Sequence, residues 1–506
     1  MASVTLTGTV GVRRSGSIVN VVLGGFIVFV LLEGLIALNC GRWPTALLLV
    51  KYTDEAFVLV AFCATLWSQH SWEIGARKLR KEALLLGGFV GVGIISSLIS
   101  HVSLTIWASQ LLLHVKGYLF FYVVATRPFD GRTLRKCSRL VGYCAMLFLG
   151  VGLIDALAPA ALRAFLGNTD YGDSRAGIIS VKSLFTHPGD FGWFTALLAA
   201  CYLAFAMVRR DVRCLAVGII ASVFCLLSMR AKSVGGLAVS TVVAILAHPR
   251  IGRAGSIALL VGVGTVFCLL FLPQIEELSA LTADRYLLHP EPLTVARSAL
   301  YLVSIEIARD YFPLGAGFGR YGSWIAREHY SGLYHEYGLS NVYGLQEGDG
   351  GAESQFACDA QWPMVLGESG VLGFLCYLAM LIVIAVSLLR HFQREGDPSI
   401  KAVHLAALMV MTQALVASIA QPVFTRGPLT YLVLGMAGVS YALTQNADAS
   451  GPRSTTRSND TGSLGKRVPL SQRGRSNLHA PERLTTFAKG PPDSLLAYGT
   501  SSEPSP

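Results

Sequence analysis

The chain has 506 residues, of which 53% are hydrophobic and only 14% are charged, and its mean hydropathy is +0.53. Soluble globular proteins carry about 25% charged residues, so this composition excludes an ordinary soluble enzyme, a disordered chain and a disulfide-rich secreted module. The formal net charge is +10. In a membrane protein a basic excess usually marks cytoplasmic loops, so this charge does not indicate a nucleic-acid partner.

Twelve apolar segments predict membrane-spanning helices, and therefore an all-α, polytopic membrane protein. In chain order they are residues 18–38, 52–68, 83–101, 104–125, 140–158, 189–208, 214–229, 233–247, 256–272, 362–388, 402–421 and 429–445. Every second connection is rich in Lys and Arg, which predicts that both termini lie in the cytoplasm. The first segment is too long for a signal-peptide core, so we interpret it as a retained span.

These segments predict three parts of the chain and two prominent outer loops. The parts are a cytoplasmic N-terminus (1–17), a transmembrane domain (18–445) and a disordered, cytoplasmic tail (446–506) rich in Ser, Pro, Gly, Thr and Arg. The shorter outer loop covers 159–188 and the larger covers 273–361, where the stretch 294–310 has a helical pattern. A long ordered loop on one face favours a functional role.

Basic side chains on the predicted outer face are the leading candidates for function, because ionisable groups near a bilayer are costly. With one histidine beside them, they are Arg175, His187, Arg230, Lys232 and Arg297. Arginine binds phosphate through paired hydrogen bonds, which favours a lipid-linked diphosphate as ligand. Each arginine could instead extend to the membrane interface. Arg230 is the hardest to explain in that way, since the positive-inside rule disfavours its position.

Two carboxylates accompany the tenth predicted span. Asp359 lies at its outer end, where it could act as a general base or as the N-cap of the following helix. Glu368 lies about two turns deeper and needs an ion pair or a role in the site. Lys116 and Glu33 lie within spans, and we expect each to pair with another buried group.

The Gly-rich stretch 313–322, which includes Arg320, superficially resembles a nucleotide-binding loop. No βαβ pattern surrounds it and it lies on the predicted outer side, so we interpret it as a tight turn between helices of the loop. The ten cysteines show no metal-ligand spacing, and we expect no metal or other cofactor. Cys40 and Cys358 both fall on the outer side, where they could form a disulfide.

Together these motifs resemble the bacterial O-antigen ligase and O-antigen/exopolysaccharide polymerase superfamily. The matching motifs, in order, are Arg175 before His187-Pro188, Met229-Arg230-Ala231-Lys232, Arg297 before Pro313–Gly319, and Glu368 with Gly370 and Gly373. The resemblance covers roughly residues 170–387 and the twelve-span architecture. Asp359 stands where ligases of this family typically carry a His, and Met229 stands where they carry a Ser. The first difference favours the polymerase branch.

The resemblance implies glycosyl transfer from an undecaprenyl-diphosphate-linked glycan at the periplasmic face of the bacterial inner membrane, independent of metal. Arg175, Arg230 and Arg297 would bind the diphosphate. Asp359 would orient or deprotonate the acceptor hydroxyl, and Glu368 would position an arginine or the acceptor. Further substrate-binding candidates are Lys232, His187 and Arg320. The expected partners are the lipid-linked glycan, membrane lipids, a chain-length regulator and export proteins, but no nucleic acid.

Two alternatives stay open at this stage. A ligase of the same superfamily would transfer a finished glycan to lipid A core or to protein. A twelve-span transporter would share the architecture, although the sequence contains no inverted repeat and no matched pair of Gly/Pro-broken spans.

Overall fold

The computed structural model describes residues 8–40, 43–67, 73, 77–127, 129, 131–167, 174–175, 178–248, 296–348 and 356–449. The chain divides into two units, Met1–Gly451 and Pro452–Pro506. The second unit, which makes up most of the predicted tail, lies outside the described residues. The described part of the first unit is almost entirely helical, with one two-stranded hairpin.

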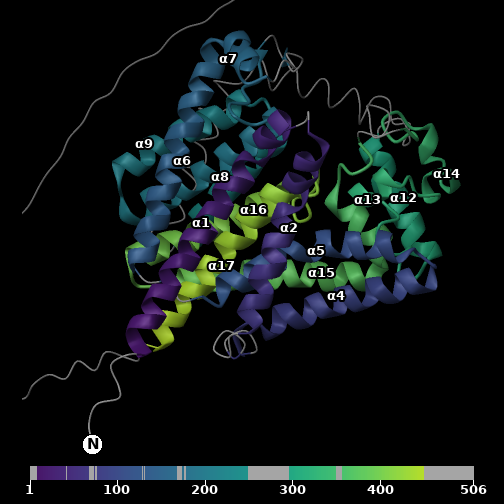
Figure 1. Ribbon diagram of the computed structural model, residues 1–506, viewed down its shortest axis with the longest axis horizontal. Coiled ribbons are helices and arrows are strands. Elements are labelled where there is room, and N and C mark those ends of the chain that lie inside the picture. Colours follow the sequence, from purple (N-terminus) through teal and green to yellow (C-terminus); the bar gives the residue numbers. More distant parts are fainter. Residues whose placement is uncertain are drawn as a thin grey trace, which may run out of the picture. The chain divides into compact units, whose positions relative to one another are not determined.

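The long helices follow the predicted spans in order (Figure 1). They are α1 (Gly8–Cys40), α2 (Pro44–Leu66), α4 (Arg80–Ile99), α5 (Leu104–Ala125), α6 (Gly131–Leu157), α8 (Pro188–Arg209), α9 (Val212–Leu227), α10 (Ala231–Ala247), α15 (Gln361–Arg394), α16 (Pro398–Ala417) and α17 (Gly427–Ala449). Each overlaps one predicted span, and α17 extends four residues into the predicted tail. The ninth predicted span, 256–272, lies outside the described residues.

Among the residues that the structure describes, six helices are long and apolar enough to cross a membrane, which identifies a membrane-embedded, polytopic architecture. They are α4, α5, α6 from Thr133 onward, α8, α15 and α16. Helix α2 is not among them because it carries Lys51, Asp54 and Glu55. Exposed tryptophans, Trp43 and Trp67, nevertheless flank its two ends, as is typical at the two membrane interfaces. The twelve-span count and the orientation of the termini stay predictions.

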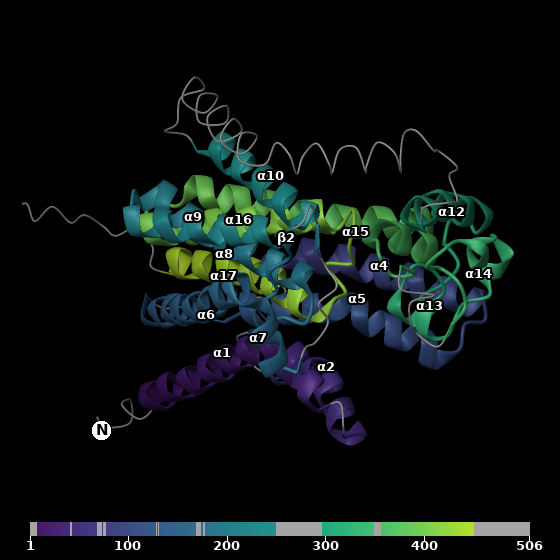
Figure 2. The ribbon, with the colours of Figure 1, turned by 90° about the horizontal axis from the view of Figure 1, so that it is seen from above.

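The two predicted outer loops contain the remaining elements. The shorter loop holds α7 (Pro159–Phe165) and an antiparallel hairpin of β1 (Ser174–Arg175) and β2 (Ile178–Ile179). The larger loop holds α12 (Ala296–Asp310), α13 (Trp324–Glu328), α14 (Leu333–Glu336) and the short 3₁₀ helix η2 (Leu339–Asn341). The helical pattern predicted for this loop is therefore confirmed for its described part. Two perpendicular views place α12, α13 and α14 together at one end of α4, α5 and α15 (Figures 1 and 2).

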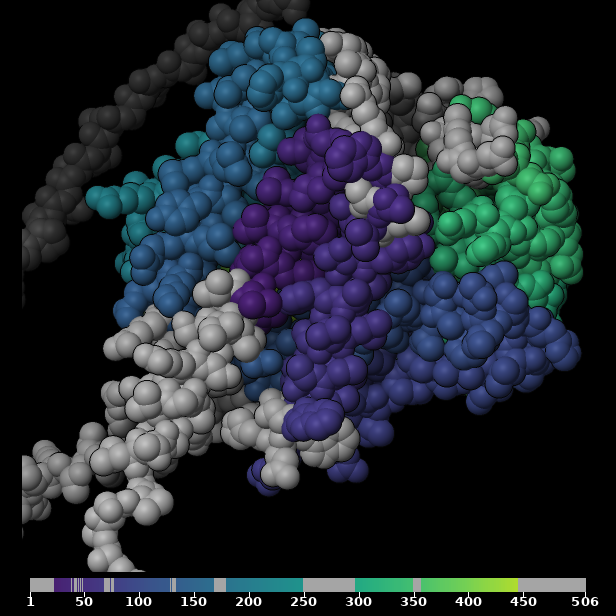
Figure 3. All heavy atoms as spheres, in the orientation of Figure 1, coloured from purple at the N-terminus to yellow at the C-terminus, as the bar shows by residue number. Residues whose placement is uncertain are grey.

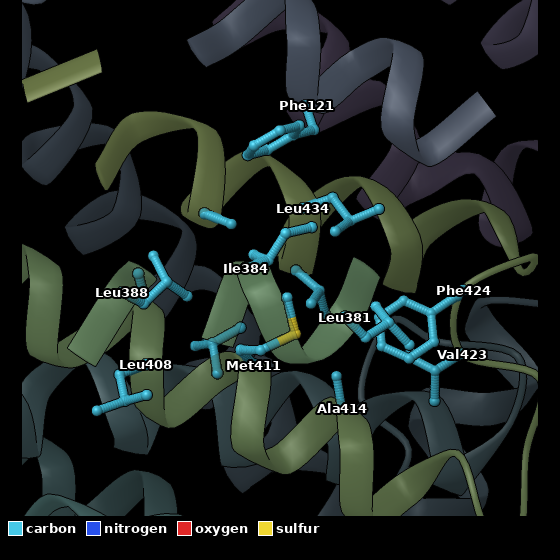
Figure 4. Close-up of a cluster of buried hydrophobic side chains, with 14 of the residues drawn as sticks. Phe121, Leu381, Ile384, Leu388, Leu408, Met411, Ala414, Val423, Phe424 and Leu434 are labelled. Carbon is cyan, nitrogen blue, oxygen red and sulfur yellow. The ribbon is translucent and has the colours of Figure 1, made fainter. Parts of the chain in front are cut away.

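Helices α5, α15, α16 and α17 pack around a common apolar core (Figure 4). Leu381 of α15, Met411 of α16, Leu434 of α17 and Phe121 of α5 are all buried within it. Lipid tails are as apolar as leucine, so close packing between such side chains, rather than release of water, holds helices together in a membrane.

A break in α15 receives the Gly-rich stretch 313–322. Gly370 has φ 60° and ψ −167° inside the helix, and the Gly317 amide donates to the Glu368 carbonyl at 2.9 Å. A side chain at Gly370 would collide with the backbone of Gly315, so only glycine fits at this contact. The interpretation of this stretch as a tight turn between helices of the loop is confirmed, since it connects α12 with α13; what the sequence did not predict is that the turn docks against a transmembrane helix.

Four charged side chains gather between α1, α2 and α5. The Lys116 ammonium lies 2.5 Å from Glu55 Oε1 and 3.2 Å from Asp54 Oδ2. The Tyr431 hydroxyl donates to the same Asp54 oxygen at 3.0 Å, and Glu33 lies within electrostatic range of Asp54 and Lys116. The expected pairing of Lys116 is thus confirmed, but its partners come from α2, whose carboxylates the sequence analysis did not consider.

We expect Lys116→Met to lower the free energy of unfolding by about 3–5 kcal/mol, since it leaves buried carboxylates without their cation. The matched control is Lys51→Met on α2, whose exposed ion pair with Glu328 spans 3.9 Å and should contribute less than about 1 kcal/mol. Equilibrium unfolding in detergent micelles measures both changes. Equal losses in the two variants would contradict this account of the buried network.

Candidate functional site

The candidate site lies where several helices begin. His187 is the N-cap of α8 and Arg230 is the N-cap of α10. Arg426 directly precedes α17, Arg297 is the second residue of α12, and Asp359 lies just before α15. A helix N-terminus carries a partial positive charge and amide groups without intrahelical partners. The local backbone therefore favours an anion at the same place as the basic side chains.

His187 and Arg230 meet as two hydrogen-bond donors. The His187 Nδ1 atom accepts from the Gly189 amide at 3.0 Å, so the neutral ring carries its proton on Nε2. This Nε2 atom lies 3.3 Å from Arg230 Nη2, which is also a donor. Two adjacent donors can both bind one acceptor oxygen of a ligand. The pair is thus arranged to bind an anion.

Lys232 lies within electrostatic range of two ion pairs. Asp359, Arg426, Asp190 and Arg297 are all close enough to act on its charge. Arg426 Nη2 is 2.9 Å from Asp190 Oδ2, and Arg297 Nη2 is 2.5 Å from Asp359 Oδ2. These contacts bring together side chains from α8, α10, α12, α17 and the start of α15.

We name Arg230, Lys232, Arg297 and Arg426 the outer basic cluster. Two carboxylates, Asp190 and Asp359, accompany these four cations, so the group has a net charge of +2 when His187 is neutral. Partial burial lowers the pKa of the Arg230 guanidinium from its ordinary value, because the charged form has lost part of its hydration. An anionic ligand would replace that hydration.

Asp359 is not the N-cap of α15. Ala360 occupies the cap position and makes no side-chain capping bond, so the capping interpretation of Asp359 is wrong. Its carboxylate instead pairs with Arg297, and about a third of each side chain is exposed (31% and 34%). The carboxylate is thus oriented by an arginine and still accessible to a substrate.

The hairpin that carries Arg175 is attached close to Arg230. Arg175 pairs with Ile178 across the hairpin, and the Val181 amide donates to the Leu227 carbonyl at the end of α9, 3.0 Å away. Leu227 precedes Arg230 by three residues. The structure describes only the backbone of Arg175, so its role in binding stays a prediction.

A buried carboxylate missed by the sequence analysis holds the segment before His187. Asp155 Oδ2 accepts from the Lys182 and Ser183 amides at 2.7 and 3.0 Å, and Oδ1 lies 3.1 Å from Arg163 Nε. All four residues are buried. An acidic residue inside the predicted span 140–158 was the available signal.

Glu368 and Arg320 have other partners. Glu368 is fully buried; its Oε1 accepts from the Gly319 amide at 2.9 Å and its Oε2 lies 3.1 Å from His114 Nε2. Arg320 Nη1 donates to the Ala316 carbonyl at 3.3 Å. Among the contacts that the structure describes, neither residue reaches the outer basic cluster. Glu368 ties the Gly-rich stretch to α5, whereas its predicted role in substrate binding stays a prediction.

Arg426 is a member of the site that the sequence analysis did not select. It lies in the short connection between the predicted spans 402–421 and 429–445, on the predicted outer side. The argument that singled out Arg230, a cation placed against the positive-inside rule, applies equally to it.

The acidic, histidine and cysteine side chains of the described residues form neither a metal site nor the disulfide that the sequence allows. Within the described ranges, no three His, Cys, Asp or Glu side chains are placed to hold a metal ion together. Cys40 and Cys358 are both free thiols, so the possible disulfide between them is not formed.

Comparisons with known proteins identify no family for this chain. No protein-family model matches it, and no curated protein matches its sequence. The resemblance to O-antigen polymerases and ligases therefore rests on the order and spacing of the motifs alone.

We expect Asp155→Ala to loosen the segment before His187, because it leaves the Arg163 charge buried and two amides without acceptors. Hydrogen exchange at the Lys182 and Ser183 amides should accelerate by at least about tenfold. The control is Asp211→Ala, which removes an exposed N-cap of α9 and affects that helix by about 1 kcal/mol. Unchanged exchange at residues 182–183 would show that Asp155 does not position this segment.

Proposed function

We propose that this protein is a membrane glycosyltransferase that polymerises undecaprenyl-diphosphate-linked oligosaccharide repeat units at the periplasmic face. The product would be an extracellular, capsular or O-antigen polysaccharide. The observation that carries the proposal is the outer basic cluster, with net charge +2, at the N-termini of several helices. A diphosphate diester carries one negative charge on each phosphate, so its charge matches that of the cluster.

The donor diphosphate would bind between His187, Arg230 and Lys232. Transfer of the glycan breaks the bond between the anomeric carbon and the diphosphate oxygen, and negative charge develops on that oxygen. Donors already aimed at this position stabilise the transition state more than the ground state. Because the lipid diphosphate is an activated leaving group, neither nucleotide nor ATP is required.

The acceptor hydroxyl would approach Asp359. As the new bond forms between this oxygen and the anomeric carbon, the hydroxyl proton passes to the Asp359 carboxylate and the bonding electrons leave with the diphosphate. Arg297 holds the carboxylate in orientation at 2.5 Å. A direct displacement of this kind inverts the anomeric configuration.

A ligase is the second candidate, since it would use the same donor chemistry. The carboxylate at position 359, in place of the family's His, favours the polymerase. The two differ in their acceptor: cells without a polymerase retain single repeat units, whereas cells without a ligase retain long chains on the carrier lipid. A transporter is less well supported, because substrate sites of transporters lie near the membrane midplane and this cluster lies at helix ends.

We expect Arg230→Ala, Arg426→Ala and Asp359→Asn each to lower the rate of polymer formation by about 100-fold or more, because each removes charge stabilisation or proton transfer. The assay is polymer length on gels, with purified protein in lipid nanodiscs and an undecaprenyl-diphosphate oligosaccharide. The control is Arg309→Ala, an exposed arginine on α12 (81% exposed side chain), which should leave the rate unchanged. Full polymer length in all three site variants would contradict the assignment of Arg230, Arg426 and Asp359 to the active site.

A second variant separates helix capping from anion binding at His187. Asparagine is a good N-cap, so His187→Asn should retain the bond from the Gly189 amide while losing the Nε2 donor beside Arg230. We expect normal thermal stability and a donor KM raised by about tenfold, the loss of one charge-assisted hydrogen bond. An unchanged KM would indicate that His187 serves only as a cap.

A further inference from the structure

The outer helix α13 presents an aromatic ring on a rigid support. Trp324, its first residue, is 46% exposed, whereas Ile325 and Ala326 are buried beneath it. The Ser323 hydroxyl caps the helix by accepting from the Ala326 amide at 3.1 Å. The indole is therefore held at the surface by a helix that is itself anchored.

Arg327 connects this ring with the candidate general base. Its guanidinium lies 5.2 Å from the centre of the Trp324 ring, a cation–π contact. Arg327 also interacts with the Cys358 thiol, and Cys358 directly precedes Asp359. Arg327, which packs against the indole, thus lies beside the residue that directly precedes Asp359.

Helix α2 adds a second aromatic–cation pair. Lys51 Nζ is 3.9 Å from Glu328 of α13 and 5.5 Å from the centre of the Tyr52 ring. Tyr52 is 55% exposed. Atoms of α2 (purple) and of the outer segment 296–348 (green) are both visible on the face shown in Figure 3. The Lys51–Glu328 ion pair thus connects the aromatic–cation pair of α2 with that of α13.

This combination suits a sugar better than a lipid. A pyranose offers a face of C–H groups that stacks on an aromatic ring, and a rim of hydroxyls that bind charged and polar side chains. Lipid-anchoring tryptophans lie at the apolar boundary of a membrane, whereas Trp324 has Lys51, Arg327 and Glu328 around it. The Lys51 and Glu328 side chains are 44% and 47% exposed, and exposed charged groups are costly within lipid, which favours an aqueous surrounding.

We infer that Trp324, Arg327, Glu328, Lys51 and Tyr52 form a carbohydrate-binding surface that holds the acceptor glycan, with its growing end toward Asp359. The acceptor role rests on the proposed function. Binding of a free oligosaccharide does not, because it requires neither the lipid donor nor turnover.

The test is calorimetric titration of the full-length protein in nanodiscs with the lipid-free oligosaccharide released by mild acid from the donor. We expect Trp324→Ala to weaken binding by about tenfold or more, as for loss of one stacked ring, and Trp324→Phe to remain within about threefold of wild type. The control is Trp67→Ala at the other end of α2, which is 92% exposed and should bind normally. Unaltered binding in Trp324→Ala overturns the inference.

Two further measurements separate the alternatives. In turnover assays Trp324→Ala should raise the KM for the acceptor while leaving kcat and the donor KM unchanged. The fluorescence of Trp324 is the difference between wild type and Trp324→Phe, and brominated lipids should not quench it. Quenching that the oligosaccharide does not relieve would identify Trp324 as a lipid anchor and would overturn the carbohydrate-binding surface. Normal polymer formation in Arg230→Ala, combined with weakened oligosaccharide binding in Trp324→Ala, would overturn the diphosphate site alone.

Discussion

The break in α15 at Gly370 is the constraint on which the outer half of the protein depends. It opens the helix backbone to the Gly-rich stretch 313–322, and the Glu368 carboxylate then binds an amide of that stretch and His114 of α5. A carboxylate in this low-dielectric position is tolerated because its hydrogen bonds are satisfied. The stretch in turn connects α12 with α13. The docking of this stretch into the break of α15 therefore positions both Arg297 and Trp324 relative to the membrane helices.

Paired charges are the second organising feature of the molecule. Within the membrane region, Lys116 joins α5 to α2 through carboxylates. At the helix ends, Arg297 and Arg426 are each held by an aspartate from another element. The first network stabilises the packing of helices. The second keeps cations in a defined geometry beside an anion site, where a bound diphosphate would compete with the aspartates for the same guanidinium groups.

Local patterns predicted most of the helices and part of the site. Apolar runs located eleven of the described helices, and the unusual position of Arg230 singled it out as a candidate site residue. The same reasoning failed where a partner was distant along the chain. Asp359 was open to interpretation as a helix cap because its partner, Arg297, lies 62 residues away in the sequence. The docking of the Gly-rich stretch depends on the break in α15, which no residue within the stretch predicts.

The sequence by itself determined a helical membrane protein and the order of its long apolar helices, and it singled out a set of arginines as candidates for binding an anion. Hydropathy, helix capping and charge placement are properties of short segments, so they can be predicted from the sequence alone. Only the tertiary structure decided that Arg426 and Asp190 join the candidate site, that Glu368 binds the Gly-rich stretch and His114, and that α13 contacts α2 through Glu328 and Lys51. Those facts depend on which helix ends meet when the helices pack. Packing brings together segments that lie far apart in the sequence, so local patterns do not predict these contacts.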